Sequence, residues 1–407
     1  MQHARKVIGR SSFLLILTLG ILNALTPFSI DLYLPAFPEI ARDLNTAVAR
    51  VSLSVSIYFV GFALGQIIYG PLLDRFGRKP PLYLGLFIYL LATLGCMKAS
   101  SIEMLLLFRF ASALGGSAAS VGATTMVRDF FPSKDGAKVF SMLMLVLSVS
   151  PLLAPSIGSF IITVWGWRSI FAILSVIALV DVALIAFVLP NAYSPDPNVS
   201  LSLGGVLSSF KRIFANQRFR SYTLAGSLSF AGLFVYVAAS PAIYMDGFGL
   251  GPKAYGAVFA LLAMGMIGGG QLNHVLVKRY GSHQVFKGAL LVQMVAGAFL
   301  LLGSLVLDFG MMSTTFSLFV ILGCAGITYP NAASLALEPF STHVGSASAL
   351  LGFLQLGVGS FVAASVGLLD VKGTLPTAVV IFLSCLLGWI TFTLGERVGR
   401  KAIVTSS

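Results

Sequence analysis

Long apolar segments separated by short polar turns make up this chain, and that pattern restricts its fold more than any motif does. We count twelve segments of about 20 residues, the length at which a helix crosses the hydrocarbon core of a bilayer, roughly 30 Å thick. Hydrophobic residues make up 57% of the 407 residues and charged ones 10%, so a soluble fold is excluded. The sequence therefore predicts an all-α membrane protein. The predicted spans are 11–37, 48–72, 80–98, 102–126, 138–164, 168–190, 219–244, 254–276, 286–307, 312–336, 345–369 and 375–396.

The longest polar connection, residues 191–218, divides these spans into two sets of six. We predict an amino-terminal six-helix bundle at 1–190, a cytoplasmic linker at 191–218 and a carboxyl-terminal six-helix bundle at 219–407. Transporters built from repeats have this layout, with their site near the bilayer midplane. Within the linker, residues 203–214 favour either a short amphipathic helix on the inner surface or a basic tether held by anionic lipid.

Positive charges predict the orientation of the spans. Of the 26 Lys and Arg residues, nineteen lie in the even-numbered turns and the two termini, six lie in the odd-numbered turns, and Arg109 lies inside a span. Lys and Arg collect on the cytoplasmic side of membrane proteins. We therefore expect a multi-pass protein of a bacterial inner membrane with both termini in the cytoplasm. This asymmetry accounts for the net charge of +12, so no nucleic-acid partner is expected.

Two ionisable residues inside the spans are the first candidates for function, because such groups are costly in a membrane and are kept mainly where they work. If the first helix continues to Pro38, Asp31 lies about 10 Å below its outer end, and Arg109 in the fourth helix lies at a similar depth. We predict Asp31 as the proton site and Arg109 as its electrostatic tuner or as an anchor for a substrate acceptor. The alternative is a permanent ion pair that locks the outer end of the bundle.

The turn after the second span carries the strongest local motif. It reads Gly70 Pro71 Leu72 Leu73 Asp74 Arg75 Phe76 Gly77 Arg78 Lys79 Pro80. An ordinary basic cytoplasmic turn would also be rich in Arg and Lys. The spacing, however, resembles the loop signature of the major facilitator superfamily, in which a glycine permits the tight turn and the acid meets a helix amino terminus or an arginine.

Further features resemble the Bcr/CflA drug-resistance branch of that superfamily. They are Ser29 to Pro35 with Pro38, Arg109, the run Val127 Arg128 Asp129, and Pro151 with Pro155 and Gly158. The resemblance implies a twelve-helix exporter that exchanges a drug for protons across the inner membrane. It also implies that the third, sixth, ninth and twelfth helices are peripheral supports. Asp181 lies in the sixth span, and a peripheral position favours a local structural partner or a buried neutral acid. As the other acid inside a span, it is also a second proton-coupling candidate.

Gating residues are predicted at the inner face and in the fifth span. Asp74 is expected to meet the amino end of the eleventh helix near Gly345 and Ser346, while the prolines and Gly158 bend the fifth helix or allow close packing. The predicted gating set is Gly70, Asp74, Arg75, Gly77, Arg78, Lys79, Arg128, Asp129, Pro151, Pro155 and Gly158.

The predicted substrate pocket is aromatic with a few polar groups, which suits a small amphipathic organic molecule. Each aromatic side chain could instead face lipid or pack in the bundle. The candidates are Asn23, Phe28, Tyr33, Tyr58, Phe62, Gln66, Phe230, Phe234, Tyr236, Tyr329, Asn331 and Gln355.

Other functional classes fit the sequence less well. The four histidines are not spaced as metal ligands, the three cysteines are scattered through the spans, and no nucleophile motif of an enzyme is present. We expect no cofactor, no bound metal and a monomer that exchanges substrate and protons in the lipid bilayer. A channel is disfavoured by the loop signature. An uptake permease for a nutrient, metabolite or siderophore remains the alternative, because one fold can import and export.

Overall fold

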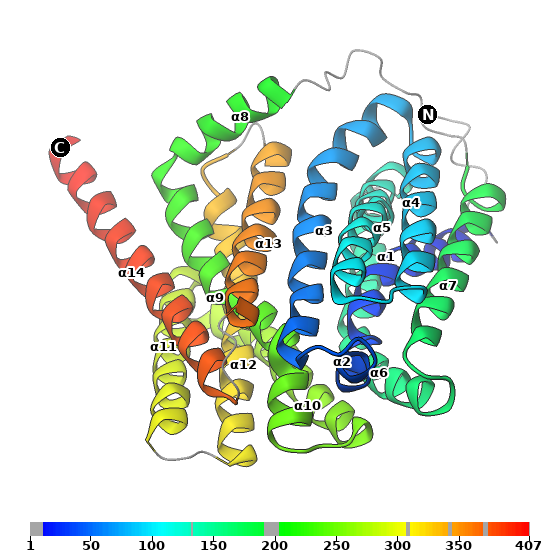
Figure 1. The fold of residues 1–407 in the computed structure, drawn as a ribbon. Coiled ribbons are helices and arrows are strands. Elements are labelled where there is room, and N and C mark those ends of the chain that lie inside the picture. The colour runs from blue at the N-terminus through cyan, green and yellow to red at the C-terminus, as the bar shows by residue number, and fades with distance from the viewer. Residues whose placement is uncertain are drawn as a thin grey trace. The chain divides into compact units, whose positions relative to one another are not determined.

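The computed structural model describes residues 11–131, 133–190, 203–306, 310–340, 344–368 and 373–406, and all regular structure in these ranges is helical (Figure 1). This confirms the predicted all-α class. Eleven helices in the described part are long and apolar enough to cross a membrane. The fifth predicted span falls on the helix Ser133–Trp165, whose shorter apolar stretch is Val149–Trp165.

The elements are α1 (Ser11–Asp31), the 3₁₀ turn η2 (Leu34–Ala36), α2 (Phe37–Asp43), α3 (Val48–Phe76), α4 (Lys79–Met97), α5 (Ile102–Phe130), α6 (Ser133–Trp165), α7 (Arg168–Phe187), α8 (Leu203–Ala215), α9 (Gln217–Pro241), the π-helical turn η3 (Ala242–Gly247), α10 (Pro252–Tyr280), α11 (Ser282–Leu305), α12 (Met311–Leu337), α13 (Val344–Leu368) and α14 (Leu375–Ser406).

Local sequence signals set the ends of these helices. The Ser101 side chain caps α5 by accepting a hydrogen bond of 3.2 Å from the Met104 amide, and Asn216 caps α9 through the Phe219 amide at 3.0 Å. Gly77 ends α3 with φ at 83°, a conformation that favours glycine, and Pro80 follows in the first turn of α4. The signature turn is therefore a sharp reversal between two spans.

The chain divides into two compact units, residues 1–47 with 57–201 and residues 48–56 with 202–407. In the first unit α4 packs against α5 and α7, and α1 packs against α5, α6 and α7 (Figure 1). Glycines let α4 and α5 approach closely, since a Cβ placed at Gly115 would lie 2.5 Å from the Gly85 carbonyl oxygen. This contact fixes α5, which carries Arg109, against α4.

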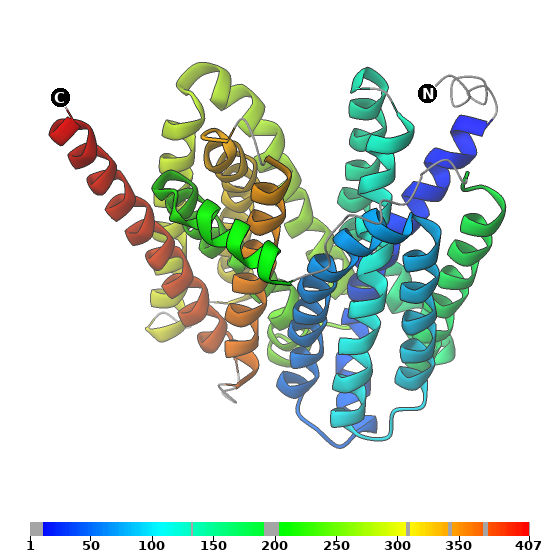
Figure 2. The ribbon, with the colours of Figure 1, turned by 90° about the horizontal axis from the view of Figure 1, so that it is seen from above.

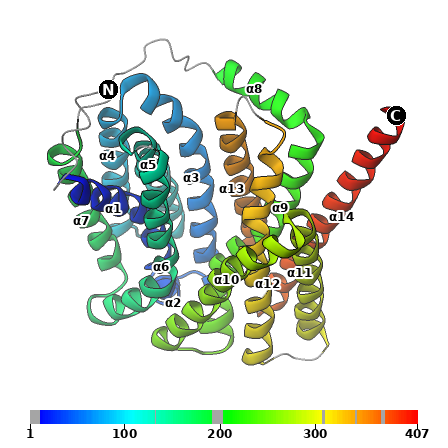
Figure 3. The same cartoon turned by 180° about the vertical axis from the view of Figure 1, so that it is seen from behind.

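In the second unit α9 packs against α12, α13 and α14, while α10 and α11 both pack against α12 (Figure 3). Aromatic side chains from α9, α11 and α14 form its core at the buried Phe219, Phe286 and Phe392. The helix α8 lies across α9 and α13, with which it makes contacts (Figure 2). Of the two alternatives for residues 203–214, the structure shows the helix, α8, while linker residues 191–202 lie outside the described residues.

A buried polar network ties three helices of the second unit together. The Gln293 amide nitrogen on α11 donates to the Ser229 carbonyl at 3.1 Å and to the Ile321 carbonyl at 3.2 Å. Its oxygen accepts from the Ser229 hydroxyl at 2.6 Å, and that hydroxyl also meets the Thr328 hydroxyl at 2.7 Å. Such a network stabilises the core because each of these groups would be costly to bury alone.

Replacement of Gln293 by leucine is expected to destabilise the protein by about 2 kcal/mol, because it leaves the buried Ser229 hydroxyl with fewer partners. Thermal unfolding in detergent measures this, with a thiol-reactive dye that reports exposure of the free buried Cys96, Cys324 and Cys385. The exposed Gln284 on the same helix supplies the control, and Gln284→Leu should unfold like the wild type. Equal unfolding temperatures for Gln293→Leu and the control would contradict a stabilising network.

Candidate functional site

Asp31 lies at the carboxyl end of α1, where the helix is interrupted. We expected one continuous helix to Pro38, and this was wrong: α1 ends at Asp31, η2 follows, and α2 begins at Phe37. Pro35 and Pro38 account for the break, because proline lacks an amide hydrogen and disfavours helical geometry in the residue before it. The carboxyl group therefore sits at a break in the helix, where it is only 5% exposed.

The Asp31 carboxylate has one hydrogen-bond partner among the described residues. Its Oδ2 accepts a bond of 3.1 Å from the Ser150 hydroxyl on α6. Close contact of α1 with α6 continues at Gly158, where a Cβ would lie 2.2 Å from the Leu32 carbonyl oxygen. The packing role predicted for Gly158 has this geometric basis, and it holds the Ser150 helix beside Asp31.

Arg109 is held between two tyrosine rings in the core of the first unit. Its guanidinium carbon lies 4.6 Å from the centre of the Tyr33 ring and 4.2 Å from that of Tyr58. One terminal nitrogen donates to the Ser29 carbonyl at 3.1 Å, whereas Nε and the other terminal nitrogen have no hydrogen-bond partner among the described side chains and backbone. The side chain is 1% exposed. A buried cation with spare donors is costly, and an acceptor that reached those donors would be bound strongly.

Asp31 and Arg109 do not form an ion pair in the described structure. The ion pairs found there lie elsewhere, and the two groups have separate partners, Ser150 for the acid and the Ser29 carbonyl for the cation. The alternative of a permanent ion pair that locks the bundle is therefore wrong for this conformation. Ser29 and Asp31 lie at the end of α1 and Tyr33 follows two residues later, so one short segment carries the acid and two contacts of Arg109.

Three residues of this site were missed by the sequence analysis. Besides Ser150 and Ser29, Tyr89 on α4 places its hydroxyl 2.6 Å from the Ser29 hydroxyl. Ser150 directly precedes Pro151, and Ser29 lies two residues before Asp31, so proximity to singled-out residues was the available signal. That signal is weak, because hydroxyl groups in helices commonly bond to their own backbone, as Ser29 also does with Leu25.

Asp181 lies on the buried face of α7, together with Leu174, Ala178 and Ile185. Its side chain is fully buried, and neither carboxyl oxygen has a hydrogen-bond partner among the described residues. The described residues thus supply no local structural partner for Asp181. A buried acid without a partner is less costly when neutral, so a neutral acid or a second proton site remains for Asp181.

The pocket candidates of the first unit have different surroundings. Tyr33 and Tyr58 enclose Arg109, and Asn23 is buried with its oxygen 3.5 Å from the Ser120 hydroxyl. Phe62 is buried, while Phe28 and Gln66 are half-buried. Of this set, the structure brings only the two tyrosines to the charged site.

Three pocket candidates of the second unit form one aromatic cluster on α9 and α12. The Phe230 ring lies 5.5 Å from Phe234 and 4.6 Å from Tyr329, which is 43% exposed. The other candidates are placed elsewhere. Tyr236 stacks on Phe259 at 5.4 Å, Asn331 donates to Asn273 at 2.6 Å, and the buried Gln355 amide nitrogen has no partner among the described residues.

The predicted gating residues of the signature turn meet at one arginine. The buried Arg78 pairs with Asp74 at 2.8 Å and with Asp129 at 2.7 Å. Arg75 lies 5.7 Å from the centre of the Phe76 ring, and Lys79 begins α4. Gly70 has open space around it, Pro151 and Pro155 lie inside α6, and the Arg128 side chain lies outside the described residues. Arg78 thus joins the turn to the carboxyl end of α5.

Removing the Asp129 charge is expected to cost more stability than removing that of Asp74. The Asp129 side chain is 22% exposed and that of Asp74 is 51% exposed, so water screens the Asp74 pair more strongly. We expect Asp129→Asn to lower the unfolding free energy by about 1.5 kcal/mol and Asp74→Asn by less than about 1 kcal/mol. Denaturant titration of the two variants in detergent measures the difference. The reverse order would contradict the buried pairing with Asp129.

Helices that can cross a membrane, a charged turn between two of them and ionisable side chains buried within them define a multi-pass membrane transporter. The sequence profile of the Major Facilitator Superfamily matches residues 19–364, and the chain belongs to this family.

Its relatives include proteins named for drug resistance. The chain is 32% identical over 367 residues to the bicyclomycin resistance protein homolog of Haemophilus influenzae, covering 90% of this chain and 92% of the relative. It is 30% identical over 355 residues to multidrug resistance protein D of Escherichia coli K12, covering 86% and 87%. The predicted resemblance to the Bcr/CflA branch is confirmed.

Solved structures share the fold at low sequence identity. A D-xylose–proton symporter superposes with a TM-score of 0.71 at 15% identity, covering 93% of this chain and 97% of the symporter. An inward-facing bacterial homolog of the human lysosomal transporter Spinster gives a TM-score of 0.69 at 17% identity, covering 95% and 96%. These similarities concern the fold alone.

Proposed function

We propose that the protein exports small amphipathic organic molecules, including drugs, across a bacterial inner membrane in exchange for protons. The observation that carries the proposal is the pair of buried charged groups on neighbouring helices, Asp31 with a neutral hydroxyl partner and Arg109 with spare donors. An acid without a cationic partner can exist in neutral or charged form, which a proton carrier requires. Arginine stays charged and cannot carry the proton.

In this proposal Asp31 binds the proton. Arg109 either adjusts the proton affinity of Asp31 through its positive charge or anchors an acceptor of the substrate. Exchange requires that substrate and proton compete, so in this proposal substrate that occupies the site favours the charged form of Asp31 and displaces its proton. Within the second unit, the cluster of Phe230, Phe234 and Tyr329 is the proposed aromatic surface of the predicted pocket. Names of the relatives support drugs as substrates, namely bicyclomycin resistance and multidrug resistance.

The working cycle is alternating access by a monomer of twelve helices in two bundles, with both termini in the cytoplasm. Family membership and the distribution of Lys and Arg support this arrangement. The turn held by Arg78 is the inner gate, and the contact of Asp74 with the amino end of α13 remains part of the proposal. No cofactor takes part in the cycle.

Transport into everted membrane vesicles tests the direction. Respiring everted vesicles have an acidic interior, so a drug–proton exchanger should accumulate labelled bicyclomycin or chloramphenicol inside them and lose that accumulation when an uncoupler is added. Vesicles without the protein are the control. Accumulation only in right-side-out vesicles would favour the uptake permease, because family membership alone fits either direction.

A further inference from the structure

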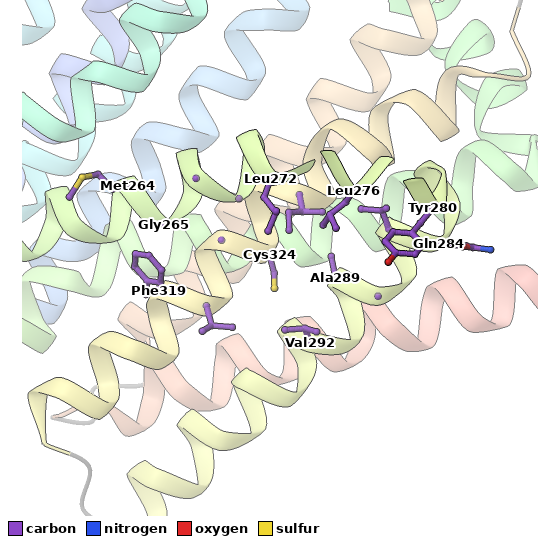
Figure 4. Close-up of a pocket in the computed structure, with 17 residues that line it drawn as sticks. Met264, Gly265, Leu272, Leu276, Tyr280, Gln284, Ala289, Val292, Phe319 and Cys324 are labelled. Carbon is purple, nitrogen blue, oxygen red and sulfur yellow. The ribbon is translucent and has the colours of Figure 1, made fainter. Parts of the chain in front are cut away.

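A groove of about 730 Å³ in the second unit has no role in the proposed transport cycle. It is formed by α10, α11 and α12, and its walls are almost entirely apolar (Figure 4). Polar side chains occur at one end only, where Figure 4 shows Tyr280 and Gln284. Met264 and Phe319 line the other end. The groove therefore has the polarity of an amphiphile, with one polar end and a long apolar body.

Two kinds of glycine line the groove, and one kind has no packing role. A Cβ at Gly269 would lie 2.0 Å from the Gly323 carbonyl oxygen, so these glycines are needed for the contact between α10 and α12. In contrast, a Cβ at Gly268 or Gly288 would meet nothing within 4 Å. Those two positions could hold larger residues without disturbing helix packing, and their small size keeps the groove open.

Positive charge is placed at the polar end of the groove. The Arg279 guanidinium carbon lies 5.2 Å from the centre of the Tyr280 ring, and Lys278 is the preceding residue. Both cations are exposed, and no described carboxylate forms an ion pair with either. The neighbouring His283 and Lys287 differ, because both contact Glu396, at 2.9 Å and 3.5 Å. Two cations at this end are thus available to an anion.

We propose that this groove binds an anionic phospholipid of the inner leaflet. An acyl chain lies along α10, α11 and α12, and the phosphate contacts Lys278 and Arg279, with the Tyr280 hydroxyl and the Gln284 amide as neutral donors. The distribution of Lys and Arg places the turn between α10 and α11 on the cytoplasmic side, where anionic headgroups and basic residues attract each other. This inference rests on the membrane placement and does not depend on drug export.

Cys324 supplies a reporter inside the proposed site, because this free thiol lines the groove. With Cys96 and Cys385 replaced by alanine, its rate of reaction with N-ethylmaleimide can be followed in detergent. Phosphatidylglycerol should slow the reaction with an apparent affinity about thirtyfold higher than that of phosphatidylcholine, as expected for two surface cations. The double variant Lys278→Gln and Arg279→Gln should bind both lipids equally.

Filling the groove tests the position of the acyl chain. Gly288→Leu should abolish protection of Cys324 by either lipid, and Gly268→Leu provides the same test if the first variant does not fold. Leu291→Phe is the control, because Leu291 is exposed on α11 outside the groove and should leave protection unchanged.

Three results would overturn the proposal. Equal protection by both lipids in the wild type would remove the role of the cations. Protection of Cys324 that persists in Gly288→Leu and Gly268→Leu would indicate unspecific coating by lipid. Lipid-independent protection that rises with protein concentration would indicate that a second copy of the chain occupies the groove.

Discussion

Asp31→Asn is expected to abolish the release of protons when substrate is added to the purified protein in detergent. Asparagine keeps the size of the side chain and an oxygen that can accept from Ser150, but it cannot lose a proton at any working pH. Substrate should still bind and move down its own gradient, whereas uphill transport driven by a proton gradient should fall to background. A pH-sensitive dye in weakly buffered solution, with a panel of lipophilic antibiotics, measures the release.

Asp181→Asn is the matched control for this prediction. Both acids are buried in the first unit, but Asp31 has a hydroxyl partner and lies on the same short segment as the contacts of Arg109, whereas Asp181 has no described partner. We expect Asp181→Asn to release protons like the wild type. If Asp181→Asn lost proton release and Asp31→Asn kept it, the proton site would lie on α7 and not on α1. No release with any compound would favour the uptake permease or an untested substrate.

Arg109→Lys is expected to weaken substrate binding by roughly thirtyfold, although it keeps the positive charge. The two rings hold the planar guanidinium so that its spare donors can meet a substrate acceptor, and lysine offers no such fixed pair of donors. Loss of a hydrogen bond from a charged donor, worth about 2 kcal/mol, corresponds to about thirtyfold in affinity. Tyr58→Phe keeps a ring face and should bind nearly normally, while Tyr58→Leu should resemble Arg109→Lys. Equilibrium binding of a labelled antibiotic to the purified variants gives these affinities.

Arg168→Lys provides the control for an arginine that stacks on an aromatic ring at the surface. Its guanidinium carbon lies 4.2 Å from the centre of the Trp167 ring, but its side chain is 43% exposed, so water screens its contacts. Binding should change by no more than about twofold. Wild-type affinity in Arg109→Lys would show that the planar contacts do not hold the site together.

Much of the architecture followed from the sequence, since each span is a local run of about 20 apolar residues whose backbone must satisfy its own hydrogen bonds in lipid. For the same reason, charged residues inside such runs were visible as candidates, and Asp31, Arg109 and Asp181 are all buried in the structure. The break after Asp31 was not predicted, although the sequence contains Pro35 and Pro38. Hydropathy is high on both sides of the break, so it does not reveal an interruption of the helix.

The pairing of side chains was decided by the tertiary structure. Depth along two helices placed Asp31 near Arg109, but depth does not give the rotation of a helix about its axis, and in an apolar helix no hydrophobic face reveals that rotation. Rotation brought Tyr33 and Tyr58 around Arg109 and Ser150 to Asp31, and it left Asp181 with no hydrogen-bond partner in the described part of the chain. The sequence thus determined which groups the membrane would have to bury, and only the packing of the helices decided what each buried group would contact.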